Sequence, residues 1–80
     1  MENTTLFEVK SMKDQIIKET LKEVETSLKE RGYNSTNQLV GYLISGDPGF
    51  ISNYQDARNK ILKLDRSEIV KSLLEKYMEE

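Results

Sequence analysis

Apolar residues recur at helical spacing along most of this chain, and that pattern is the strongest constraint on its fold. Between residues 11 and 31, apolar side chains return every three or four positions, while Lys and Glu occupy the other faces. A helix with one apolar side must bury that side against another element. The stripe consists of Ile17, Leu21, Val24 and Leu28.

Start and stop signals divide the rest of the pattern into four helices. Gly32 and Gly46 are typical helix stops, and an out-of-phase apolar pattern predicts a break near Asp65. Asp47-Pro48-Gly49 is typical of a turn in which glycine takes a positive φ. We expect Gly41 to allow a close approach between helices. A capping residue followed three positions later by an acid or amide predicts the helix starts, at Ser11/Asp14, Ser35/Gln38, Ser52/Gln55 and Asp65/Glu68.

The chain is therefore predicted to be all-α, a compact bundle of about four short helices. Residues 1–10 show no clear period and are predicted to be a flexible regulatory tail, with a short extended piece at 6–9. Residues 11–80 are predicted to be a single helical domain. A chain of 80 residues buries a small core, so pairing with a second copy would add stability.

Composition excludes several kinds of chemistry. The chain has no Cys and no His, so it has no disulfide, no thiolate nucleophile, no imidazole base and no common zinc ligand set. Its four glycines form no phosphate-binding loop. We expect no cofactor, no metal and no enzymatic activity. The absence of a secretory signal or a long apolar segment predicts a cytoplasmic protein.

The middle of the chain carries an unusual run of motifs. These are Gly32-Tyr33-Asn34, Asn37-Gln38-Leu39-Val40-Gly41-Tyr42-Leu43, Ser45-Gly46-Asp47-Pro48 and Asp56-Ala57-Arg58-Asn59. Together they resemble the IreB/ReoM family of small regulators from Firmicutes, and the resemblance extends in register from the N-terminal threonines to Tyr77. The chain departs from the family where Ser35-Thr36 replaces a proline-containing helix start, and where Asn53 and Leu62 replace basic residues.

The resemblance implies a helical homodimer, packed or intertwined, without catalytic activity. It implies phosphorylation of a tail threonine by a PASTA-type Ser/Thr kinase, reversed by a cognate phosphatase. The unmodified protein would restrain peptidoglycan precursor synthesis by promoting Clp-dependent proteolysis of a cell-wall enzyme, through a protease or adaptor protein. Phosphorylation would relieve this restraint and raise antibiotic tolerance.

The resemblance also indicates which residues carry this role. It places Thr4 in the position of the modified threonine and leaves Thr5 as a secondary acceptor. It indicates Arg58, Lys63 and Arg66 as contacts with a protein partner. As exposed charges, Arg58 and Arg66 are expected to contribute little to stability. The basic stretch from Arg58 to Arg66 is also a candidate docking place for the phosphorylated tail.

Two other functions compete with this interpretation. A small DNA-binding repressor could use four short helices with a basic third helix, but the net charge of −2 and the acidic first and last helices disfavour contact with phosphates. A purely structural dimerisation module would have no use for the tail. Neither membrane nor nucleic acid is an expected partner.

Overall fold

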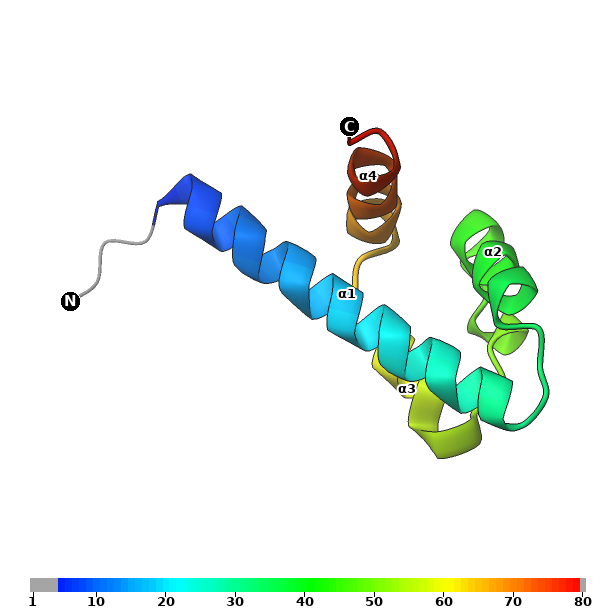
Figure 1. Ribbon diagram of the computed structural model, residues 1–80. Coiled ribbons are helices and arrows are strands. Elements are labelled where there is room, and N and C mark those ends of the chain that lie inside the picture. The colour runs from blue at the N-terminus through cyan, green and yellow to red at the C-terminus, as the bar shows by residue number, and fades with distance from the viewer. Residues whose placement is uncertain (1–4, 80) are drawn as a thin grey trace.

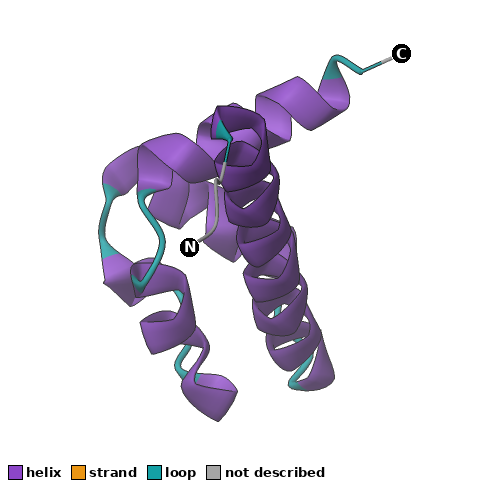
Figure 2. Ribbon diagram, turned by 90° about the vertical axis from the view of Figure 1, so that its left-hand side faces the viewer, coloured by secondary structure: helices purple, strands orange, loops and turns teal. Residues whose placement is uncertain are grey.

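The computed structural model describes residues 5–79, which form four α-helices and two short 3₁₀ turns (Figure 1). Figure 2 shows only helices and loops in this part of the chain. The predicted all-α fold of four helices is confirmed. The elements are α1 (Leu6–Glu30), α2 (Ser35–Ser45), the 3₁₀ turns Pro48–Phe50 and Tyr54–Asp56, α3 (Ala57–Leu62) and α4 (Arg66–Tyr77).

The core lies along the C-terminal half of α1. In the view of Figure 1, α2 and α4 rise above α1 and α3 lies below it. Three of the four residues of the predicted stripe on α1 are buried, and Leu21 packs partly buried against them. The buried apolar residues are Ile17, Val24 and Leu28 of α1, Tyr42 of α2, Ile51 in a loop, Ala57 and Ile61 of α3, and Ile69 of α4.

Helix α1 begins earlier than the sequence predicted. Thr5, not Ser11, is the N-cap: its hydroxyl accepts a hydrogen bond from the Glu8 N–H at 3.1 Å. The Thr5 N–H in turn donates to Glu8 Oε1 at 3.1 Å, which completes a capping box. The predicted helix start at Ser11 and the predicted extended piece at residues 6–9 are therefore wrong. Thr5 and Glu8 form a capping box that starts the helix more than one turn before Ser11.

The predicted starts of α2 and α3 are also displaced. One residue of each predicted capping box, Gln38 and Ser52, forms hydrogen bonds with the other. Gln38 and Ser52 exchange two hydrogen bonds: the Ser52 N–H donates to Gln38 Oε1 at 2.9 Å, and Gln38 Nε2 donates to Ser52 Oγ at 3.1 Å. This pairing ties α2 to the loop before α3. Asn34, not Ser35, therefore caps α2, and α3 begins at Ala57 instead of near Ser52.

A left-handed turn precedes α3. Gln55 and Asp56 have φ values of 53° and 64°, which residues with a side chain rarely adopt. The turn is held from both sides, since the buried Ser27 hydroxyl donates to Gln55 Oε1 at 2.8 Å and Asn59 Nδ2 donates to Asp56 Oδ1 at 2.8 Å. Next to it, the Tyr54 hydroxyl donates to Glu30 Oε1 at 2.9 Å, and that hydrogen bond raises the pKa of Tyr54.

The predictions made for the glycines and for the cap of α4 are partly correct. Gly46 ends α2 with φ 77°, as expected, and Asp65 caps α4 by accepting from the Glu68 N–H at 3.1 Å. Gly49 does not have the predicted positive φ, since the side chain of Asp47 closes its turn on the Gly49 N–H instead. Gly41 does permit a close approach, but to a side chain: a Cβ there would lie 2.5 Å from the Phe50 ring.

A matched pair of Ile→Val substitutions tests where the core lies. Ile61 is 0% exposed, and removing one methylene there is expected to lower the free energy of unfolding by about 0.5–1.5 kcal/mol. Ile44 is 80% exposed, and the same change there is expected to alter it by less than about 0.5 kcal/mol. Urea denaturation at one protein concentration measures both, and equal midpoints would contradict this assignment.

Candidate functional site

The first candidate site is the capped N-terminal end of α1. Thr5 is exposed, yet its hydroxyl is engaged by the Glu8 N–H. The Thr5 backbone and side-chain hydrogen bonds hold the pKa of Glu8 below its ordinary value, so this carboxylate is ionised at neutral pH. Thr4, the predicted main acceptor, lies outside the described residues. This cap was not predicted from the sequence, although the spacing of Thr5 and Glu8 is typical of a capping box.

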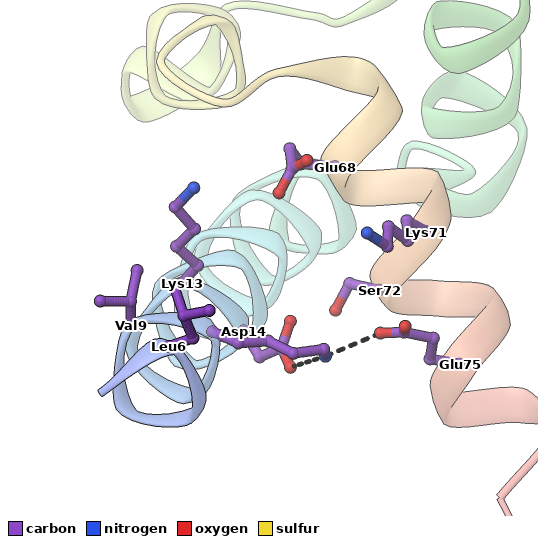
Figure 3. A pocket seen from close by; sticks show the side chains of 9 residues that line it. Leu6, Val9, Lys13, Asp14, Glu68, Lys71, Ser72 and Glu75 are labelled. Carbon is purple, nitrogen blue, oxygen red and sulfur yellow. Dashed lines mark hydrogen bonds and ion pairs between the residues drawn. The ribbon is translucent and has the colours of Figure 1, made fainter. Parts of the chain in front are cut away.

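Next to this end, a polar bridge joins α1 to α4. Lys10 Nζ donates to Glu75 Oε1 of α4 at 2.8 Å and to Asp14 Oδ2 at 2.9 Å (Figure 3). The hydrogen bonds to Glu75 and Asp14 raise the pKa of Lys10 well above its ordinary value. The i,i+4 spacing of Lys10 and Asp14 was visible in the sequence, but the partner on α4 was not.

The bridge spans the opening between α1 and α4. Figure 3 shows Leu6, Val9 and Lys13 on the α1 side and Glu68, Ser72 and Glu75 on the α4 side. A larger hollow of about 750 Å³ continues along the two helices and is lined by Phe7, Ile17, Leu21 and Leu73 among others. The walls are apolar side chains bordered by both charges, an arrangement suited to contact with another protein surface.

The second candidate site consists of the predicted partner contacts Arg58, Lys63 and Arg66, which differ in exposure and in hydrogen bonding. Arg58 is half-buried and its Nε donates to the Ile51 carbonyl at 2.9 Å. Arg66 is exposed, but its Nη1 donates to the Leu43 carbonyl at 3.1 Å near the end of α2. Lys63 is exposed beyond the end of α3, and no ion pair or side-chain hydrogen bond involves it among residues 5–79. The two arginines therefore hold backbone segments together, which revises the expectation that they contribute little to stability.

The basic stretch is also anchored to α1, far from the tail. Lys60 Nζ lies 3.2 Å from Glu23 Oε2. Thr5 precedes Glu23 by eighteen residues of continuous helix, about 27 Å at 1.5 Å per residue. Lys60 therefore lies far along α1 from its capped N-terminal end, and docking of a phosphorylated tail on the basic stretch stays a prediction.

The described residues contain little that suggests small-molecule chemistry. No group of three or more potential metal-ligating side chains occurs between residues 5 and 79. None of the helices in that range has the length and apolar character needed to cross a bilayer. The described surface instead offers a capped helix end, an apolar opening and anchored cations.

These features define a small all-α protein with an apolar opening on its described surface, and comparison with known families shows to which family it belongs. Residues 2–79 match the family described as IreB regulatory phosphoprotein. This match covers nearly the whole chain, so the protein belongs to the IreB family. The resemblance inferred from the motifs around Gly41 and Gly46 is thereby confirmed, and with it a regulatory role.

The arginine contacts predict a stability difference within the basic stretch. Arg58→Ala removes a charged donor from a carbonyl in a half-buried place, and we expect it to cost about 1.5–3 kcal/mol of unfolding free energy. Lys63→Ala is the matched control and should change it by less than about 0.5 kcal/mol. Thermal and urea unfolding measure both. If the two variants unfold alike, the Arg58 hydrogen bond contributes nothing.

The capping box predicts a local effect at the start of α1. Thr5→Ala should destabilise the first turn by about 1 kcal/mol, whereas Thr5→Ser keeps the accepting oxygen and should preserve most of it. Amide hydrogen exchange at Glu8 is the measurement. Because the folded pKa of Glu8 lies below its ordinary 4.5, its contribution is present above pH 4.5 and is lost as the pH falls through the lower folded value. Equal protection in the Ala and Ser variants would refute the cap.

Proposed function

We propose that this protein is a non-catalytic regulator of peptidoglycan precursor synthesis, switched by phosphorylation of threonines at its N-terminus. The observation that carries the proposal is the match of residues 2–79 to a family of regulatory phosphoproteins. In this role the unmodified protein promotes Clp-dependent proteolysis of a cell-wall enzyme in the cytoplasm of a Firmicute. A PASTA-type kinase releases that restraint and raises antibiotic tolerance, and a cognate phosphatase restores it.

The acceptors in this proposal are Thr4 first and Thr5 second. Thr5 supports the order, because its hydroxyl is held in the capping box and a kinase must break that contact to reach it. A kinase active site needs an extended, accessible substrate, and chain termini supply one more readily than packed helices do. A phosphate adds about −1.5 to −2 charges at neutral pH, and Glu8 is the nearest described acid along the chain.

The proposed partner contacts are Arg58, Lys63 and Arg66, directed to a protease, an adaptor or the target enzyme. Lys63 gives the cleanest assay of this role, since its ammonium group takes part in no ion pair among the described residues. Loss of regulation in Lys63→Ala with an unchanged melting temperature would support a partner contact. Arg58→Ala would not separate contact from folding, because Arg58 holds the Ile51 carbonyl.

Phosphorylation by the cognate kinase tests the order of acceptors. Incubation followed by mass spectrometry should show most phosphate on Thr4 and a slower addition on Thr5. Thr4→Ala should lose most of the incorporated phosphate, whereas Thr36→Ala, an exposed threonine in α2, should incorporate as much as the wild type. Full modification of the Thr4→Ala protein would refute the assignment, and absence of any phosphate would refute the switch itself.

The same proposal includes a homodimer. The radius of gyration is 13.7 Å, compared with about 12 Å for a globule of this length. Fifteen large apolar side chains of the described residues are exposed. Sedimentation at micromolar concentration should therefore give about twice the chain mass of 9.3 kDa. A single 9.3 kDa species over the whole concentration range would contradict the dimer.

A further inference from the structure

The first turn of α1 is held by polar contacts and not by burial. Leu6 and Phe7 are 89% and 79% exposed, and Ile17 is the first side chain of the helix that is buried. The capping box of Thr5 and Glu8 begins the helix. A helical segment without buried apolar contacts has a low local stability. The position at which α1 begins therefore depends on which capping contacts form.

A second possible start lies further along the same helix. Ser11 and Asp14 have the spacing of a capping box. This box is not formed in the structure, because Ser11 lies inside α1 and the Asp14 carboxylate accepts a hydrogen bond from Lys10 Nζ at 2.9 Å. Inside a helix, the Ser11 N–H donates to the carbonyl four residues earlier. It becomes free for Asp14 only when the preceding turn is not helical, so the two starts exclude each other.

The longer helix has one contact with α4 that a shorter helix would lose. Lys10 Nζ donates to Glu75 Oε1 at 2.8 Å, across 65 residues of sequence. Both side chains are about half exposed, so the contact adds only modestly to stability. Lys10 precedes Ser11 and belongs to the segment that the second start would release. The balance between the two starts is therefore coupled to a residue of α4.

The threonines proposed as phosphate acceptors come directly before this segment. In the structure the chain is helical from Leu6 onward, and the Thr5 hydroxyl accepts a hydrogen bond from the Glu8 N–H. A kinase active site needs an extended, accessible substrate, which a helix does not supply. A helix that begins at Ser11 would free the Thr5 hydroxyl and the five residues that follow it.

We propose that α1 has two alternative starts, and that the shift from Thr5 to Ser11 makes the acceptor threonines accessible to the kinase. This inference rests on the proposed phosphorylation switch and adds a conformational step to it, the local unfolding of one segment. The contact between Lys10 and Glu75 favours the protected start. It thereby couples a residue of α4 to the rate of phosphorylation.

A proline at position 12 separates the two starts. Inside the longer helix, Met12→Pro removes one backbone hydrogen bond and clashes with the Glu8 carbonyl. In a helix that begins at Ser11, position 12 is the first helical residue, where proline is favoured. Proline also directs the residue before it to the extended backbone that a capping residue adopts. Met12→Ala is the matched control, because alanine removes the same side chain and keeps the longer helix.

The measurements are the helix start and the rate of phosphate incorporation by the cognate kinase in the full-length protein. Carbon chemical shifts from NMR should show residues 6–10 helical in Met12→Ala and extended in Met12→Pro. Mass spectrometry should show phosphate added about fivefold faster to Met12→Pro, since a cap changes the equilibrium of a helix end about fivefold. Ser11→Ala removes the second cap and should slow the addition by a similar factor.

A variant on α4 tests the coupling without touching the sequence that the kinase reads. Glu75→Gln weakens the contact with Lys10 and should raise the rate of phosphorylation about twofold. Glu79→Gln is the matched control, because Glu79 lies near the same end of α4 but pairs with Lys76. It should leave the rate as in the wild type.

The outcomes separate this inference from the proposed function. Wild-type protein that takes up no phosphate contradicts the phosphorylation switch itself. Wild-type protein that is phosphorylated, with equal rates in a folded Met12→Pro and in Met12→Ala, overturns the two starts and leaves the switch in place. If Met12→Pro does not melt cooperatively, Ser11→Ala and Glu75→Gln decide, and wild-type rates in both overturn the inference.

Discussion

The structure depends on the burial of one apolar stripe on the C-terminal half of α1. Val24 and Leu28 are fully buried, and α2, α3 and the loop around Ile51 pack over them. In a chain without disulfides, this packing has to offset most of the conformational entropy that folding removes. The remaining features, including the left-handed turn held by Ser27 and the arginine contacts to carbonyls, are arranged around that stripe. The N-terminal half of α1 and most of α4 extend beyond it.

The sequence predicted the fold well wherever the signal was local. The spacing of Ile17, Val24 and Leu28, the stop at Gly46 and the cap at Asp65 all act within one or two helical turns, so neighbouring residues suffice to recognise them. The start of α1 was missed for a different reason. Two candidate caps lie six residues apart, at Thr5 and Ser11, and the helix takes the first one because nothing in Leu6 to Lys10 opposes helical structure.

The errors in the middle of the chain have a tertiary origin. Ser35/Gln38 and Ser52/Gln55 have the spacing of capping boxes, but Gln38 and Ser52 satisfy each other across 14 residues. Gln55 adopts a left-handed backbone because its side chain reaches the buried Ser27. Such long-range pairs leave no periodic trace in a single sequence. The candidate site shows the same limit. The sequence motifs identified the family, but only the structure shows that Arg58 and Arg66 donate hydrogen bonds to backbone carbonyls.

The bridge at Lys10 makes the contact between α1 and α4 sensitive to ionic strength. Among residues 5–79, the contact of Lys10 with Glu75 is the ion pair that joins the projecting half of α1 to α4, and both side chains are about half exposed. Exposed pairs contribute about 0–1 kcal/mol and are screened over roughly 10 Å at 0.1 M salt. The packed half of α1 is held by apolar contacts that salt does not weaken. Raising the salt concentration therefore weakens the contact between the projecting half of α1 and α4, while the apolar core that also holds Ile69 of α4 is unaffected.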